Sequence, residues 1–435
     1  MMQHSSRLVA CAIFAVISAF GQNNTSQNAN QRILSIRDLG KRDYTVIPTI
    51  AQYLKDPNRD IRIEAVKAIV RIDTTHSLDA LVQATHDNDP EIQIRATDGI
   101  VNAYLPGYVA KGGLTGSLTR GVRQVKSFFS SRNDQVVDPD VIVRPDVAQA
   151  LGDEVRGGAS LDARANAALA AGILRARAAV PALVQAAHST DSDLIFECLV
   201  ALQKIHDPSA GPGIGFLAHD LDDRIQATAL ETIGILRSLE SASDVRSALK
   251  NARSVRIRRA ALEALAMLAI PGDRAIFQQY SKDSDAELRA SALEGLGRIR
   301  EPEDYPALEA AYNEQNADWR VHLAAAFALV DEGKVDTSEF SPLPYLVESL
   351  NLKGRAYVAN AYLVELARRE DVRASLAKLL PEATKDQKIA LCSILGSSHA
   401  EDAVPILNGL AKDLDPDVAF AASRALRILQ ARRPS

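Results

Sequence analysis

A fifteen-residue motif recurs along the chain at a nearly constant period. It reads SVRIRRAALEALAML at residues 254–268, DAELRASALEGLGRI at 285–299 and DPDVAFAASRALRIL at 415–429. Aligned on the first apolar residue of each copy, the motif has eleven anchors: Ile61, Ile92, Ala163, Leu194, Ile225, Ile257, Leu288, Val321, Ala356, Gln387 and Val418. Successive anchors are 31 to 35 residues apart except for a single gap of 71, and a weaker copy begins near residue 30. Such a sustained period indicates about twelve stacked units, which bury their apolar faces against one another.

Each position of the motif has a physical role that predicts a helix. Four residues after the anchor the side chain is usually Ala, and eight residues after it the side chain is apolar. These offsets lie on one helical face, so we expect the alanine to let helices approach and a leucine such as Leu296 to be fully buried. Three residues before the anchor, ten of the eleven copies carry a good N-cap side chain: Asn58, Asp89, Ser160, Asp191, Asp222, Ser254, Asp285, Asp318, Thr384 and Asp415.

A second helix is indicated between successive motifs. Pro48, Pro181, Pro306 and Pro405 occupy matching points in segments such as AAVPALVQAAHS. Proline is tolerated in the first turn of a helix because the amide that it lacks would have no intrahelical partner there. Two helices of roughly 12 residues with short turns account for the period.

The pattern of a capping Asp, then LR or IR, then Ala and Leu, with Pro opening the second helix, resembles the HEAT repeat family. The resemblance covers residues 30 to about 432 and is closest to the short bacterial form seen in phycobilisome-lyase-like proteins. It implies an all-α, right-handed α–α superhelix of the HEAT or armadillo type, with a concave face built from second helices. It also implies scaffolding more often than catalysis. The arginine that HEAT repeats favour after the anchor is present in four copies but replaced elsewhere by Ile195, Tyr357 and Ala419, which breaks any Asp–Arg ladder.

The first 21 residues are typical of a secretory signal peptide. One positive charge precedes the apolar run LVACAIFAVISAF, and Ala19 and Gly21 form a small-x-small site with cleavage expected before Gln22. We therefore predict an exported chain, periplasmic or secreted. The expected organisation is a signal peptide at 1–21, a disordered polar lead-in at 22–30, repeats at 31–104, an insertion at 105–145 and the main solenoid at 146–432.

After cleavage, two cysteines remain in the chain. Cys198 and Cys392 lie in first helices six repeats apart. Because stacked helices are roughly 8–10 Å apart, their sulfurs are expected to lie on the order of 50 Å from each other, far beyond the reach of a disulfide. Both are predicted to be buried free thiols.

A search for catalytic, metal and cofactor motifs predicts none of these sites. His86, His188 and His219 recur near the ends of second helices, but the same position elsewhere holds Lys or Asn, as expected for cations near a helix C-terminus. The segment GPGIG at 211–215 resembles a phosphate loop, yet no strand precedes it, and we interpret it as a turn between helices. The His-Glu dipeptides of the HEAT-family enzyme deoxyhypusine hydroxylase do not occur. A bilin lyase or hydroxylase relative remains an alternative.

The long gap between anchors reflects an insertion at 105–145, between a helix that ends near Tyr104 and a second helix at 146–156. Its first half carries five basic residues and no acidic one between residues 106 and 133, whereas the whole chain has a net charge of −5. The insertion includes an amphipathic stretch that either packs back on the solenoid or meets an anionic partner or lipid headgroups. The candidate contact residues are Lys111, Arg120, Arg123, Lys126, Phe128 and Phe129.

These observations predict an exported scaffold that binds a protein or another macromolecule and has no catalytic activity of its own. The acidic charge balance argues against a nucleic-acid partner. The alternatives are an enzyme of the lyase or hydroxylase type and a peripheral membrane protein held by the insertion.

Overall fold

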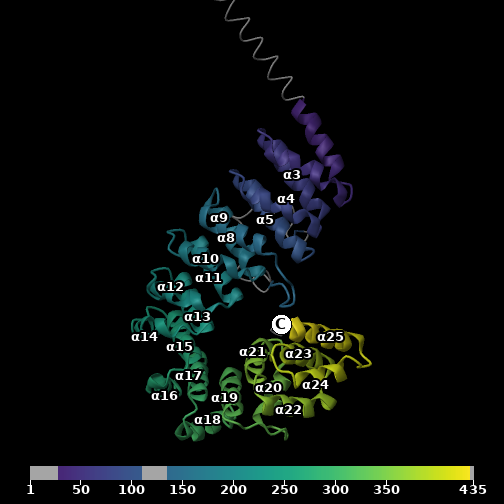
Figure 1. The fold of residues 1–435 in the computed structure, drawn as a ribbon. Coiled ribbons are helices and arrows are strands. Elements are labelled where there is room, and N and C mark those ends of the chain that lie inside the picture. The colour runs from purple at the N-terminus through teal and green to yellow at the C-terminus, as the bar shows by residue number, and fades with distance from the viewer. Residues whose placement is uncertain (1–27, 110–134, 432–435) are drawn as a thin grey trace, which may run out of the picture. The chain divides into compact units, whose positions relative to one another are not determined.

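The computed structural model describes residues 28–109 and 135–431, and within these ranges the regular elements are helices (Figure 1). The chain divides into two compact units. Unit 1 holds the described residues of Met1–Val137 together with Val143–Ile205, and unit 2 holds Asp138–Ile142 and the described residues of His206–Ser435. None of the described helices is both long and apolar enough to cross a bilayer.

Unit 1 alternates the two helix types that the sequence predicts. Residues 28–39 are helical, so the lead-in predicted to be disordered up to residue 30 already contains helix at 28–30. The motif-bearing first helices are α3 (Arg59–Ile72), α5 (Pro90–Tyr104), α9 (Leu161–Ile173) and α11 (Ser192–Ile205). The second helices are α2 (Ile47–Ala51), α4 (Leu78–Thr85), α8 (Pro145–Gly157) and α10 (Val180–Ala186).

Unit 2 continues the same alternation. Its first helices are α13 (Asp223–Leu236), α15 (Val255–Leu268), α17 (Ala286–Ile299), α19 (Trp319–Asp331), α21 (Ala356–Leu366), α23 (Lys385–Gly396) and α25 (Pro416–Ala431). Its second helices are α12 (Gly211–Ile214), α14 (Ala242–Lys250), α16 (Arg274–Tyr280), α18 (Tyr305–Tyr312), α20 (Pro342–Ser349), α22 (Glu370–Leu379) and α24 (Ala403–Leu410).

The predicted N-caps hold the starts of the first helices. The Asp285 carboxylate accepts the backbone amides of Glu287 at 3.0 Å and Leu288 at 3.2 Å, which satisfies two of the orphan donors in the first turn of α17. Side-chain caps also precede the other first helices whose cap the sequence predicts. Helix α21, where Lys353 stands at this position, begins without a side-chain cap.

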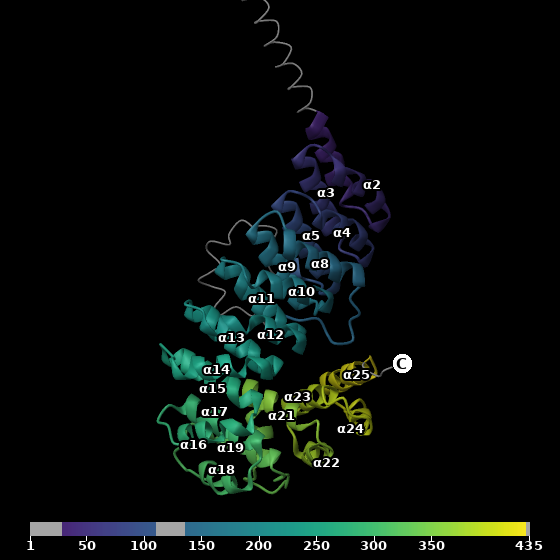
Figure 2. The ribbon, with the colours of Figure 1, turned by 60° about the vertical axis from the view of Figure 1, so that its left-hand side comes forward.

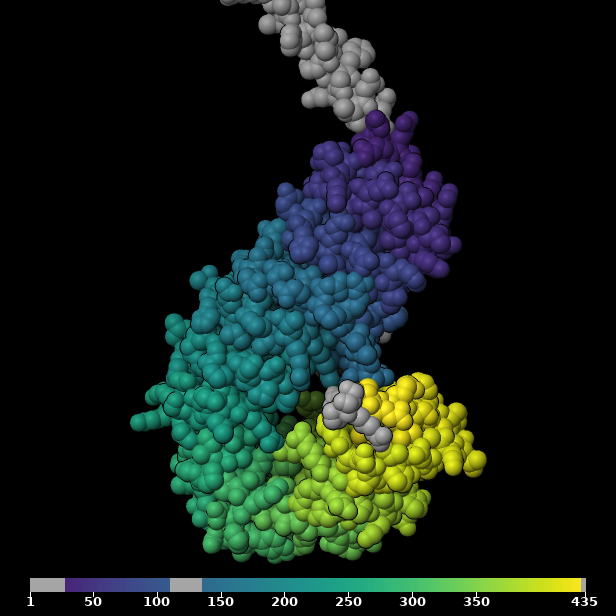
Figure 3. Space-filling model, viewed as in Figure 1, coloured from purple at the N-terminus to yellow at the C-terminus, as the bar shows by residue number. Residues whose placement is uncertain are grey.

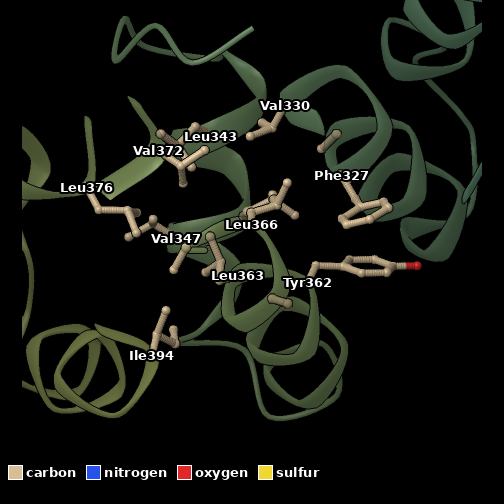
Figure 4. Packing of buried hydrophobic residues seen from close by; sticks show 14 of the residues in the cluster. Phe327, Val330, Leu343, Val347, Tyr362, Leu363, Leu366, Val372, Leu376 and Ile394 are labelled. Atoms are coloured by element: carbon tan, nitrogen blue, oxygen red, sulfur yellow. The ribbon is translucent and has the colours of Figure 1, made fainter. Parts of the chain in front are cut away.

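Small residues allow the first helices to stack closely. Leu296 is 1% exposed and Ala292 fully buried in α17, which confirms the predicted core register. A Cβ added at Gly297 would lie 2.3 Å from the Cβ of Ala328 in α19, so these two helices approach as closely as a glycine permits. Figure 4 shows the adjoining core, in which Phe327, Leu363 and side chains of α20, α22 and α23 interdigitate.

In unit 2 the first helices, and not the second helices, form the inner side of the curved stack. Figure 1 shows α13, α15, α17, α19 and α21 facing the inside of the curve, and Figure 2 shows the same helices from another side. Helices α14, α16 and α18 form the outer rim, which is teal to green in Figure 3. The expectation of a concave face built from second helices is therefore wrong for this unit.

Two further sequence predictions have clear outcomes. Cys198 and Cys392 are both buried and not disulfide-bonded, as expected, and burial raises the pKa of their thiols to about 12 and about 11, respectively. The interpretation of GPGIG as a turn is wrong, because Gly211–Ile214 forms the short helix α12. A Cβ at Gly211 would lie 2.3 Å from the Cβ of Ser238, so this glycine allows close packing against the next repeat.

Residues at both ends of the predicted insertion form hydrogen bonds within unit 1. Val109 donates its amide to Oδ1 of Asn102 at 2.8 Å, and the buried Val137 donates its amide to the carbonyl of Ile173 at 2.9 Å. Just before α8, the amide of Arg144 donates to the Tyr104 hydroxyl at 3.1 Å. The described ends of the insertion, 105–109 and 135–145, thus contribute to the packing of the repeats.

Candidate functional site

The residues that the sequence proposes for partner binding, Lys111, Arg120, Arg123, Lys126, Phe128 and Phe129, lie outside the described residues. The three histidines considered as metal ligands are exposed, and His219 instead contacts Oδ1 of Asp244 at 3.1 Å. No group of His, Cys, Asp and Glu suited to hold a metal ion occurs within the described part of the chain.

The inner face of unit 2 presents an ordered row of side chains that sequence reasoning missed. Six residues after the anchor, successive first helices α13, α15 and α17 carry Glu231, Glu263 and Glu294. The next two repeats carry Phe327 and Tyr362 at the same position. The sequence carries the signal as three glutamates at spacings of 32 and 31, at a position of the motif other than the anchor and the positions four and eight residues after it. We call Glu231, Glu263 and Glu294 the carboxylate row.

Glu294, the last member of the row, is buried and fully engaged. The Tyr362 hydroxyl donates to its Oε2 at 2.7 Å, and the Arg298 guanidinium, one turn later in α17, pairs with its Oε1. The Arg298 guanidinium carbon lies 4.7 Å from the centroid of the Phe327 ring, which in turn stacks on Tyr362 with centroids 4.5 Å apart. Figure 4 shows the two rings lying one above the other. A buried charge is tolerated here because it is paired and hydrogen-bonded.

Glu365, one turn after Tyr362 in α21, joins two arginines. Arg298 donates to its Oε2 at 2.7 Å, and Arg237, at the C-terminus of α13, donates to its Oε1 at 2.5 Å. Burial by itself raises the pKa of Glu365, but the hydrogen bonds and charges of Arg298 and then Arg237 outweigh it and lower the pKa to about 2. This carboxyl is therefore ionised at neutral pH.

The pKa values of the two remaining members of the row, Glu263 and Glu231, are raised, whereas that of Glu365 is lowered. Burial among protein atoms, together with the charges of Glu294, Glu231 and Glu287, raises the pKa of Glu263 to about 7. Burial likewise raises the pKa of Glu231, against an opposing effect of Arg256. Both side chains nevertheless have solvent access. Each carboxyl thus has protein atoms on several sides and solvent on one side, as expected on an inward-facing surface.

This arrangement has a defined chemical capacity. Glu263 can exchange a proton near neutral pH, whereas Glu294, Arg298 and Glu365 are occupied with one another. A carboxyl with a pKa near neutrality in an enclosed position is a feature that active sites and ligand-binding surfaces share with structural networks. The described residues of unit 2 thus place one carboxyl that titrates near neutral pH, Glu263, beside a set of paired charges.

Comparisons with known proteins support the repeat assignment. A family model described as HEAT repeats matches residues 17–100 and 243–330. No curated protein sequence matches the chain. Structures with a similar fold include importin beta, at 12% identity and a TM-score of 0.43, for which the match covers 90% of this chain and 58% of that one.

Two other similar structures are enzymes or parts of enzymes. The CpcE–CpcF complex of phycocyanin lyase from Nostoc sp. PCC7120 matches at 17% identity and a TM-score of 0.37, covering 58% of this chain and 93% of that one. Human deoxyhypusine hydroxylase matches at 19% identity and a TM-score of 0.25, covering 66% and 96%. Likenesses this distant concern the fold alone. The match to the family model and the helix pairs described above identify the chain as an α-solenoid that contains HEAT repeats in both of its units.

Proposed function

We propose that this protein is an exported, non-catalytic scaffold that binds another protein or macromolecule on the inner face of unit 2. The observation that carries the proposal is the carboxylate row. Glu231 and Glu263 stand at one register on successive helices and reach solvent, so they form a continuous feature that a partner can follow across repeats. Repeat stacks commonly use the inward surface created by their curvature in this way.

The state of the neighbouring charged groups favours binding over catalysis. A general acid or base must reach the reacting atoms of a substrate. Glu294 and Glu365 both point at Arg298 and are shielded by their partners, which leaves them as supports of the surface. The enzyme alternative would need a substrate held against Glu263, which has a suitable pKa.

Partner capture with paired variants tests the proposed face. The full-length protein would be produced with its own N-terminus, cross-linked in the cell envelope and purified, and the co-purifying proteins would be quantified. Glu231→Lys with Glu263→Lys is expected to remove a specific partner. The control is Glu348→Lys, which places one such charge reversal on the exposed side of the second helix α20. Retention of every partner by the double variant would exclude the inner face as the site.

Export is a separate part of the proposal. It rests on the charged start, the apolar run and the small-x-small site in the first 21 residues. N-terminal sequencing of the protein recovered from the envelope or medium is expected to begin at Gln22. A chain that keeps Met1 and stays inside the cell would contradict it.

A further inference from the structure

Arginine–carboxylate pairs are the usual links between consecutive repeats of unit 2. Arg259 pairs with Asp285, Arg274 with Asp304 and Arg300 with Asp331, at N–O distances of 2.6, 2.7 and 2.7 Å. The partners in these pairs are 26, 30 and 31 residues apart, that is, about one repeat. Such links stabilise each interface separately and leave the curvature of the stack as the sum of many small angles.

Glu365 breaks this rule. Its link to Arg298 spans 67 residues, and its link to Arg237 spans 128 residues. Arg237 closes α13 in the left-handed conformation, with φ of 51°, and its side chain reaches α21 although α15, α17 and α19 intervene in the sequence. A contact between helices that are four repeats apart on the inner side fixes the sum of the intervening angles, which no neighbour-to-neighbour contact can do.

Glu365 forms two ion pairs, which we call its Arg298 arm and its Arg237 arm, and the two arginines differ in exposure. The Arg298 side chain is 8% exposed and also holds Glu294, whereas the Arg237 side chain is 53% exposed. An exposed ion pair contributes little to stability and is screened by salt, while a buried one is costly to break. The Arg237 arm can therefore detach while the Arg298 arm and the surrounding core stay intact.

We infer that Arg237, Arg298 and Glu365 form a latch that holds unit 2 in its curled conformation, with the Arg237 arm as the part that opens. This goes beyond the proposed partner binding, because the latch acts in the free protein. Its release widens the inner face of unit 2. Ionic strength and any charged group that competes for Glu365 or Arg237 are its physical triggers.

Distance measurement within unit 2 tests the latch. Spin labels would be attached to Lys250→Cys at the end of α14 and Ala374→Cys on the exposed side of α22, in a Cys11→Ser background. The native Cys198 and Cys392 are buried thiols with raised pKa and should not react. Electron–electron double resonance would then report the distribution of distances between the labels.

The latch predicts a longer mean distance and a broader distribution for Arg237→Gln than for the parent protein, and the same direction for Glu365→Gln. High salt should move the parent toward the Arg237→Gln distribution and leave that variant unchanged. The matched control is Arg259→Gln, which removes an arginine of similar exposure that links neighbouring repeats; it should keep both the parent distances and the salt response. Circular dichroism confirms folding of each variant. An unchanged distribution in folded Arg237→Gln, or an equal change in Arg259→Gln, would overturn the inference.

Discussion

The Tyr362 hydroxyl donates a hydrogen bond to Oε2 of Glu294 at 2.7 Å, although 68 residues separate the two in the sequence. Both residues are buried, and Arg298 pairs with the other oxygen of the same carboxylate. The carboxylate is thus satisfied on both oxygens, which explains how a charge can stand between helices α17 and α21 without destabilising them.

Tyr362→Phe should destabilise unit 2 by about 1.5–3 kcal/mol, because it removes a hydrogen bond to a charged group and leaves one buried acceptor without a donor. Chemical denaturation followed through the fluorescence of Trp319, on the neighbouring α19, measures the loss. A free-energy change near zero would mean that water replaces the hydroxyl at no cost.

Leu296→Ala should destabilise the protein by roughly 2–5 kcal/mol, because it opens a cavity between consecutive first helices. Leu296 is 1% exposed in the middle of α17. The same Trp319 fluorescence assay measures the loss. The control is Leu221→Ala, which changes an exposed leucine of unit 2 and should have little effect on stability. A loss below about 1 kcal/mol at Leu296 would mean that this part of the core relaxes to fill the space.

The repeat architecture could be predicted from the sequence because its determinants are local and repeated. An N-cap such as Asp285, an alanine four residues after the anchor and a leucine such as Leu296 each act within one or two turns of a helix. Eleven imperfect copies then average out the ambiguity of any single one. Helix α21 illustrates the same dependence on local sequence. Its copy of the motif has Lys353 at the cap position, and the helix begins without a side-chain cap.

The carboxylate row could have been found from the same repeat register, but the latch could not be predicted in this way. Arg237 and Glu365 meet because four repeats curve together, and curvature is a sum of packing angles that no single motif encodes. Which helix lines the inner side also depends on relative side-chain bulk across whole interfaces, so the family expectation of second helices was wrong for unit 2. The interpretation of GPGIG as a turn failed for a similar reason. Gly211 packs against Ser238 in the next repeat, and its local sequence does not reveal that contact.

In unit 1, the raised pKa of Glu154 in α8 should make the stability of the folded state depend on pH. Burial raises its pKa to about 8, against the opposing hydrogen bond that the Thr97 hydroxyl donates to Oε2 at 2.7 Å. Between its ordinary value of 4.5 and about 8, the folded protein keeps a proton that the unfolded chain has released. Stability contributed by this group therefore falls as pH rises through that window, by up to about 1.4 kcal/mol per pH unit.

Glu154→Gln should remove this dependence, because a neutral amide does not titrate. Its advantage in stability over the parent protein should grow from pH 5 to pH 8. Hydrogen–deuterium exchange of peptides from α5 and α8, compared between the two proteins at each pH, measures it within unit 1. Asp153→Asn, at the preceding and more exposed carboxyl, is the control. A constant difference across this range would show that Glu154 is ionised in the folded state.

The described ends of the insertion restrict which part of it can carry specificity. A replacement of residues 106–145 by a short turn would remove the buried Tyr108 and Val137 and the ion pairs of Arg144 with Asp79 and Asp146. We therefore expect such a deletion to destabilise unit 1. Residues 110–134, which include the six basic and aromatic candidates, are the part that can be exchanged while these attachments are kept.

Replacement of 110–134 by a Gly/Ser segment of equal length should leave the melting temperature nearly unchanged and abolish binding to anionic surfaces. The reason is that the exchange removes one negative charge, that of Asp134, but five positive charges, those of Lys111, Arg120, Arg123, Lys126 and Arg132. It retains every described contact of the insertion. Co-sedimentation with vesicles containing phosphatidylglycerol measures binding, neutral phosphatidylcholine vesicles are the control, and the parent protein should lose binding as salt rises. A large fall in melting temperature would show instead that Phe128 and Phe129 pack on the repeats. Undiminished vesicle binding would place the anionic contact on another surface.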